Sequence, residues 1–175
     1  MKHNSANMDR GKGSGRTISV PTAQFIDGIR RELESGLSVE ICCRGNSMNP
    51  FLVDRRDSIV LSPCDSSALK KGDVVLGLSA SGHWVIHRIV RLNPTLLNGD
   101  GNYVRSCEHI PEGQVYAKMT AYVRKGRRAG TDSLQWRLWS SFWNFCGRLA
   151  IGSWSLRRII LGLWRRCHRS LVHRP

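Results

Sequence analysis

The stretch Arg44-Gly45-Asn46-Ser47-Met48-Asn49-Pro50-Phe51-Leu52 separates two β-rich segments of the chain. Glycine and asparagine favour a turn at this point, and the proline that follows stiffens the backbone. Such a turn presents the Ser47 hydroxyl on a rigid support. A serine hydroxyl is a weak nucleophile until a neighbouring base accepts its proton, so the sequence must also supply a base.

His87 is the candidate base. It lies in the β-rich segment Trp84-Val85-Ile86-His87-Arg88-Ile89, and a strand would hold the imidazole rigidly enough to reach a hydroxyl. A third group usually fixes the tautomer of such a histidine, and Asp100 in Asn98-Gly99-Asp100-Gly101-Asn102 is the choice here. The same five residues are typical of a turn, so a structural role for Asp100 is the competing interpretation.

Around these residues the sequence predicts a mainly β domain, either a barrel or a coiled sheet. Phe25, Ile29 and Leu33 recur at helical spacing between Pro21 and Gly36, which predicts a short amphipathic helix before the first strand. Short β-rich segments separated by Gly, Pro, Asn and Asp then follow, at residues 37–43, 58–61, 73–78, 83–90, 95–97 and 115–123.

The two ends of the chain differ from this domain. Residues 1–19 are polar and rich in glycine, which predicts a leader without fixed structure, so the predicted domain covers residues 20–130. Residues 131–175 form a Trp- and Arg-rich tail, predicted as one or two helices broken near Gly147 or Gly152. Arginines interrupt every apolar stretch of the tail, so we expect it to lie on a membrane surface and not to cross the membrane.

The charge of the chain points to an anionic partner. It holds 27 Lys and Arg against 13 Asp and Glu, a formal net charge of +14, and no acidic residue follows Asp132. We expect residues 134–175 to contact anionic lipid. Nucleic acid is not an expected partner, because no helix-turn-helix, zinc-finger or base-stacking motif is visible. The oligomeric state is not indicated.

Six cysteines are scattered without metal-ligand spacing, so neither a metal site nor a cofactor is expected. Free thiols and a reducing compartment are the favoured interpretation, with a Cys43–Cys107 bridge as the alternative. The N-terminus lacks the apolar run of a signal peptide, which predicts a cytoplasmic protein peripheral to the inner face of the membrane.

Four short motifs in order give the chain a resemblance to a known family. Gly45-x-Ser47-Met48-x-Pro50, Gly72-Asp73-Val74-Val75, His87-Arg88-Ile89 and Gly99-Asp100-Gly101-Asn102 resemble the ordered motifs of signal-peptidase-like serine proteases. The first is equally similar to the self-cleaving repressor proteases of the SOS and phage type, which share the β fold. The resemblance covers about residues 38–125 and implies an endopeptidase that cleaves an extended peptide or leader segment.

Details of the resemblance assign further roles. Most bacterial members use a lysine base, whereas His87-Arg88 is similar to the archaeal and endoplasmic-reticulum enzymes, which use serine and histidine. Gly45 stands where some relatives offer a serine hydroxyl to the oxyanion, which leaves the backbone N–H groups of Asn46 and Ser47. Glu108 competes with Asp100 as the group that orients His87.

Two further expectations concern the substrate and the competing function. A substrate groove lined by Met48, Phe51, Leu52 and Trp84 is expected, with ordinary core packing as the competing interpretation. The alternative function is a peptidase fold whose catalytic residues are unused and that binds a peptide, a membrane or nucleic acid.

Overall fold

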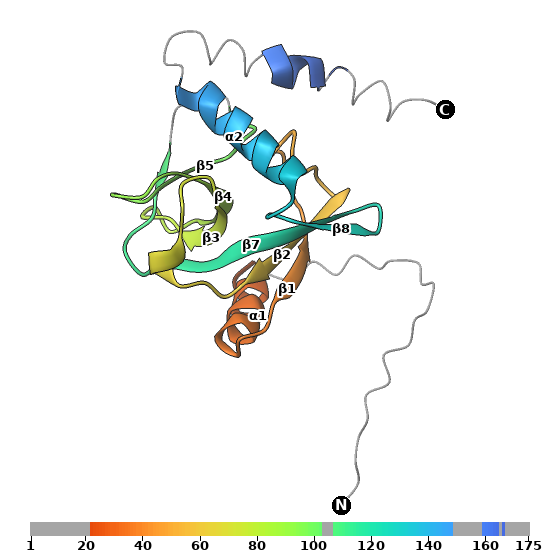
Figure 1. Ribbon diagram of the computed structural model, residues 1–175. Coiled ribbons are helices and arrows are strands. Elements are labelled where there is room, and N and C mark those ends of the chain that lie inside the picture. The colour runs from red at the N-terminus through yellow and green to blue at the C-terminus, as the bar shows by residue number, and fades with distance from the viewer. Residues whose placement is uncertain (1–21, 103–106, 149–158, 165, 167–175) are drawn as a thin grey trace, which may run out of the picture.

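Eight antiparallel strands form one sheet in the part of the chain that the structure describes. The computed structural model describes residues 22–102, 107–148, 159–164 and 166, so the predicted leader at 1–19 lies outside the described residues. The strands run in the order β1-β2-β7-β3-β4-β5-β6, with β8 paired to β7 (Figure 1). Their bounds are β1 Val39–Cys42, β2 Asp57–Ser62, β3 Val74–Leu78, β4 Trp84–Arg91, β5 Leu96–Asn98, β6 Glu108–His109, β7 Val115–Arg124 and β8 Arg127–Gly130.

This sheet confirms the prediction of a mainly β domain and decides between the two predicted forms, a barrel and a coiled sheet. Each of the six predicted β segments corresponds to a strand, whereas β6 and β8 were not predicted. The sheet is open and not closed into a barrel, because β1 and β6 stand at its two ends. Its buried side chains form two clusters, of which the larger includes Ile59, Leu61 and Leu76 and the smaller Val75 and Ile89.

Helix α1, Thr22–Glu34, precedes the sheet and lies against it on the lower side in the view of Figure 1. Ile26, Ile29 and Leu33 share one helical face and are buried, each contributing about 1.5–3 kcal/mol of hydrophobic stabilisation. The predicted helix is confirmed, but Phe25 is half-exposed and Ile26 takes its place in the core. Gly36 has φ +78°, a left-handed conformation that suits glycine at the end of a helix.

Helix α2, Leu134–Arg148, follows β8 and lies on the upper side of the sheet in Figure 1. Trp136 and Trp143 of this helix have buried side chains. A second helical segment occupies residues 159–164. The description of α2 ends at Arg148, one residue after Gly147, and the rest of the region of the predicted break, including Gly152, lies outside the described residues. Within the described ranges, no helix combines the length and the apolar character needed to span a bilayer.

A buried carboxylate joins the start of β2 to the end of β7. The Asp57 side chain is fully buried and accepts hydrogen bonds from Arg56, Arg124 and the Val53 N–H, at 2.7–3.0 Å. Burial acts to raise the pKa of Asp57, but these hydrogen bonds outweigh it and hold the pKa below its ordinary value. The ionised carboxylate therefore stabilises the folded chain here.

This network predicts a dependence of stability on pH. The folded-state pKa of Asp57 is lowered, so its contribution is complete above about pH 4 and is lost as the pH falls through the folded-state value. We expect Asp57→Asn to lower the free energy of unfolding by about 2 kcal/mol at neutral pH. Urea titrations should show this difference narrowing below about pH 4. Asp27→Asn on the exposed surface of α1 is the control, and an equal loss in both variants would contradict the assignment.

Candidate active site

The loop between β1 and β2 holds Ser47 in a tight backbone turn. Gly45 has φ +81°, and its N–H donates to the Asp54 side chain at 2.9 Å. Asn49 closes the turn on Asn46 through its backbone N–H at 3.2 Å and through its side-chain amide at 3.0 Å. Among the described residues, no hydrogen bond uses the N–H group of Asn46 or of Ser47. Both predicted oxyanion donors are thus available to a ligand.

The loop after β5, residues 99–102, lies directly against this turn. The Gly101 N–H donates to the Ser47 carbonyl oxygen at 2.7 Å. A Cβ atom on Gly99 would lie 2.5 Å from that oxygen, and one on Gly101 would collide with the carbonyl oxygen of Asn46. Only glycine allows the two backbones to approach so closely. The glycines of the fourth motif therefore support the nucleophile turn.

His87 is oriented by Glu108. The Nδ1 atom of His87 lies 3.0 Å from Oε2 of Glu108, which β6 positions by pairing Glu108 with Leu97 of β5. Because a carboxylate accepts hydrogen bonds, the neutral imidazole in this pair carries its proton on Nδ1 and has its lone pair on Nε2, the atom that a general base uses. His87 is buried, and the Glu108 side chain is partly exposed. The structure therefore favours Glu108 over Asp100 as the orienting residue.

Asp100, the other predicted orienting residue, has a partner that is not His87. Its carboxylate is buried and accepts two parallel hydrogen bonds from Arg88, at 2.9 Å from Nε and 2.7 Å from Nη2. Arg88 is the residue after His87 on β4, and it pairs in register with Asn98, directly before the loop. The ion pair thus ties the strand that carries His87 to the loop that supports Ser47.

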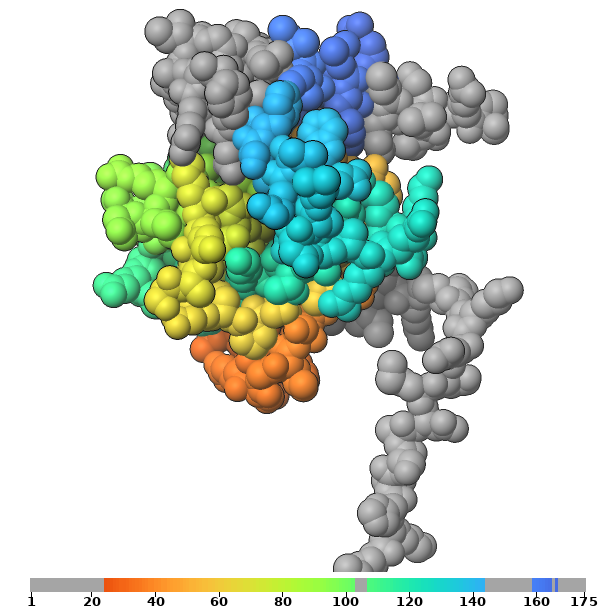
Figure 2. Space-filling view, viewed as in Figure 1, coloured from red at the N-terminus to blue at the C-terminus, as the bar shows by residue number. Residues whose placement is uncertain are grey.

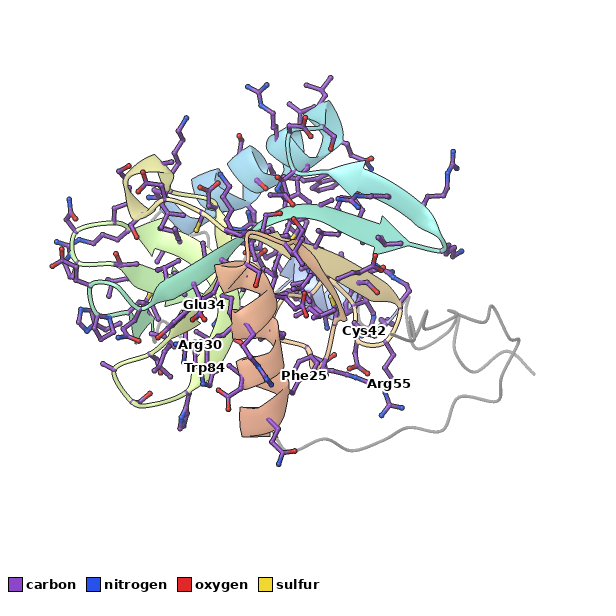
Figure 3. All side chains as sticks on the ribbon, turned by 90° about the horizontal axis from the view of Figure 1, so that it is seen from below. Phe25, Arg30, Glu34, Cys42, Arg55 and Trp84 are labelled. Carbon is purple, nitrogen blue, oxygen red and sulfur yellow. The ribbon has the colours of Figure 1, made fainter. Side chains whose placement is uncertain are left out.

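Ser47 and His87 line one cavity of about 330 Å³. No hydrogen bond joins Ser47 to His87 in this structure, although both have described side chains. Hydrogen bonds between catalytic groups are often long without substrate and shorten when it binds, so this does not exclude a dyad. The cavity continues towards α1, where Phe25 and Trp84 also line it (Figure 3).

Three of the four residues of the predicted substrate groove line this cavity. Met48 and Leu52 come from the nucleophile loop, and Trp84 begins β4. Phe51 does not belong with them and is a correction to the prediction, because its ring packs edge-on against Trp143 of α2 at 5.3 Å between centroids. The remaining lining is mostly aliphatic, which suits a small apolar substrate side chain.

Two cysteines, Cys42 and Cys43, also line the cavity. Cys43 is partly buried, and burial, reinforced by the nearby Asp57 carboxylate, raises the pKa of its thiol to about 12. The thiolate is the reactive form of cysteine, and at neutral pH this thiol stays protonated. Cys43 is therefore a poor nucleophile in this cavity. The thiols of Cys42, Cys43, Cys64 and Cys107 are all free, so the alternative Cys43–Cys107 bridge is absent from the structure.

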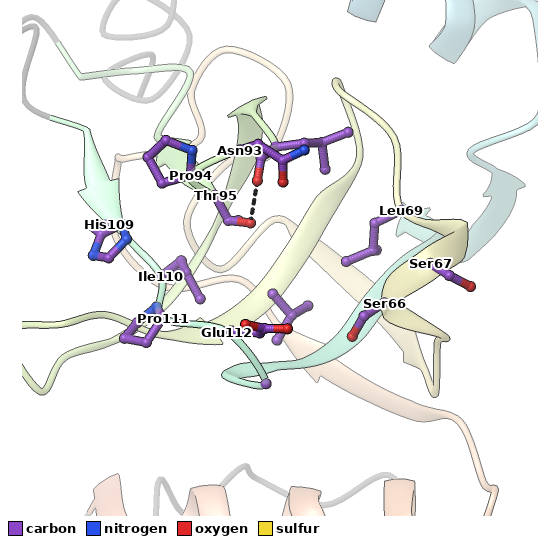
Figure 4. Close-up of a pocket in the computed structure, with 13 residues that line it drawn as sticks. Ser66, Ser67, Leu69, Asn93, Pro94, Thr95, His109, Ile110, Pro111 and Glu112 are labelled. Carbon is purple, nitrogen blue, oxygen red and sulfur yellow. Dashed lines mark hydrogen bonds between the residues drawn. The ribbon is translucent and has the colours of Figure 1, made fainter.

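A larger hollow of about 640 Å³ lies elsewhere on the molecule, and neither Ser47 nor His87 lines it. It contains Ser66 and His109, but these stand on opposite sides of the hollow in the view of Figure 4. No hydrogen bond connects them among the described residues. The described residues also contain no group of three side chains suited to hold a metal ion.

The chemistry of the site thus depends on three side chains that distant parts of the chain contribute. The β1–β2 loop supplies the hydroxyl, β4 the imidazole and β6 the carboxylate. Comparisons of the chain with protein-family models, with curated proteins and with solved structures find no match.

Proposed function

We propose that this protein is a serine endopeptidase of the signal-peptidase type, with Ser47 as nucleophile, His87 as general base and Glu108 as the residue that positions His87. The observation that carries the proposal is the pairing of Glu108 with Nδ1 of a histidine that shares a mostly apolar cavity with Ser47. A buried imidazole held by a carboxylate beside a turn serine is the arrangement that acyl transfer needs.

In the proposed reaction Ser47 Oγ forms a bond to the carbonyl carbon of the scissile peptide while its proton passes to Nε2 of His87. The negative charge that develops on the carbonyl oxygen is met by the backbone N–H groups of Asn46 and Ser47. The C–N bond then breaks, and His87 returns the proton to the leaving amine. A water molecule, deprotonated by His87, releases the acyl group from Ser47 by the same steps.

The edges of the sheet beside the cavity favour an extended substrate. The register of β4 with β5 begins at Arg88, so Trp84–His87 pair only with β3 among the described strands. Strand β1 is the end strand of the sheet and pairs only with β2. Residues from both strands line the cavity. Unpaired strand edges bind extended peptides through backbone hydrogen bonds.

The competing function is binding of a peptide without cleavage. The missing hydrogen bond between Ser47 and His87 is the observation that favours it. The Glu108–His87 pair is the observation on the side of cleavage, because a carboxylate on Nδ1 holds the imidazole in the tautomer and orientation that a general base needs. Measurement of cleavage separates the two functions, since a binding protein would retain peptide affinity and produce no new N-termini.

Loss of either member of the dyad should abolish cleavage. We expect Ser47→Ala and His87→Ala each to lower the rate about a hundredfold to ten thousandfold, because a positioned base contributes that much. The protein is incubated with a peptide library made from an unrelated proteome, and new N-termini are identified by mass spectrometry. Circular dichroism checks the fold.

Ser81→Ala and His83→Ala are the matched controls, because both residues are exposed in the hairpin between β3 and β4. They should cleave the library like the wild-type chain. Equal cleavage by the Ser47 and His87 variants and by the controls would refute the dyad.

Glu108→Gln tests which carboxylate serves His87. The amide keeps the shape of the side chain but can present its NH₂ to Nδ1, which favours the wrong tautomer. We expect kcat to fall by about a hundredfold or more while KM changes little. Asp100→Asn should mainly lower thermal stability, because Asp100 bonds to Arg88. Loss of kcat in the Asp100 variant alone, with stability unchanged, would restore Asp100 to the catalytic role.

A further inference from the structure

Exposed apolar side chains are concentrated on α2 and on the segment 159–164. Of the nine large apolar residues that the described chain exposes, six lie there. They are Leu134, Leu138, Trp139, Phe142, Ile159 and Leu163, with exposed fractions of 41–71%. Figure 2 shows α2 at the molecular surface with the segment 159–164 beside it. We call these six side chains the α2 patch.

Leu134, Leu138 and Phe142 of the patch lie on the outer side of α2, whose inner side is already packed, whereas Trp139 lies at the edge of that side, where its ring also contacts Phe51 at 6.2 Å between centroids. Leu134, Leu138 and Phe142 recur every four residues and so share one face of the helix. Trp136 and Trp143, seven residues apart, share another face and are buried against the domain. The helix is therefore apolar on both sides, and only one side has a partner within the described chain. An apolar helix face exposed to solvent in this way marks an interaction site.

Positive charge borders the patch. A hollow of about 540 Å³ beside α2 contains Lys70, Lys71, Lys118 and Arg137 together with the carboxylates of Asp73 and Asp132. Lys118 is paired with Asp73 at 2.9 Å, whereas Lys70, Lys71 and Arg137 are exposed. Four cations against two carboxylates leave an excess of two positive charges. The chain beyond residue 133 adds arginines and no acidic residue.

We propose that the α2 patch docks on a bilayer that contains anionic phospholipid. The apolar side chains would enter the boundary between headgroups and acyl chains, and Lys70, Lys71 and Arg137 would contact lipid phosphates. Leucine, phenylalanine and tryptophan next to basic residues have the chemistry of an interfacial helix. This inference does not depend on the proposed protease activity.

Charge and composition argue for lipid over two other occupants. A second copy of the chain, itself at +14, would bring basic hollows of the same sign together. Nucleic acid would satisfy the lysines and arginines but would leave the six apolar side chains exposed to water. An anionic bilayer is the partner that matches both the charge and the apolar surface.

Vesicle flotation of the full chain tests the proposal. Two vesicle types are compared, phosphatidylcholine alone and an equal mixture of phosphatidylcholine and phosphatidylglycerol. We expect the wild-type chain to float with the mixed vesicles and much less with the neutral ones. The double variant Leu138→Asp/Phe142→Asp should lower the bound fraction about tenfold or more, and Arg137→Glu should do so to a similar extent. Circular dichroism confirms that the variants fold.

The matched controls lie on the other side of the sheet. Leu37→Asp removes an exposed leucine at the end of α1, and Arg31→Glu reverses an exposed charge on α1. Both should float like the wild-type chain. The proposal is overturned if the wild-type chain fails to float, or if the α2 variants float as well as the controls. Dimers in sedimentation, or DNA binding, without flotation would assign the patch to a second copy or to nucleic acid.

Discussion

The buried ion pair between Arg88 and Asp100 holds the two halves of the candidate site together. Besides its bonds to Asp100, the Arg88 guanidinium donates from Nη1 to the Gly72 carbonyl at 2.8 Å and to the Ser140 hydroxyl at 3.0 Å. The ring of Phe51 lies 5.6 Å from its central carbon. Loss of one partner of such a pair costs about 3–5 kcal/mol, because the other charge stays buried. A lysine has no planar fork of donors and could not replace Arg88.

The partners of Arg88 connect several parts of the molecule to the candidate catalytic residues. Ser140 belongs to α2, whose outer side carries the proposed lipid-binding patch, and Phe51 follows Ser47 in the nucleophile loop. The ring of Phe51 packs against three tryptophans of α2, and these contacts hold the loop against the helix. One helix therefore supports the nucleophile turn on its inner side and presents apolar side chains on its outer side. The two proposals share this helix but are tested separately.

The elements that carry Ser47 and His87 can be predicted from the sequence, whereas the partner of His87 depends on how the strands pair. Turn residues around Ser47 and the β-rich segment around His87 predict both elements, because turn chemistry and apolar patterning are local signals. The choice between Asp100 and Glu108 is not local. It depends on the pairing of β5 with strand β6, and β6 has only two residues, too few for a recognisable β pattern in the sequence. Strand β8 was also missed, because its exposed arginines give no apolar alternation. The turn before it, Lys125-Gly126, has positive φ at both residues and is a signal from which the hairpin could have been predicted.

Amide hydrogen exchange in the Asp100→Asn variant tests most directly whether the ion pair supports the nucleophile turn. The reporters are the Gly101 N–H, bonded to the Ser47 carbonyl, and the Asn49 N–H, bonded to the Asn46 carbonyl. The account predicts that both amides lose protection together, while the amides of β7 keep theirs. Protection that is unchanged at Asn49, or a loss confined to residues 98–102, would contradict it.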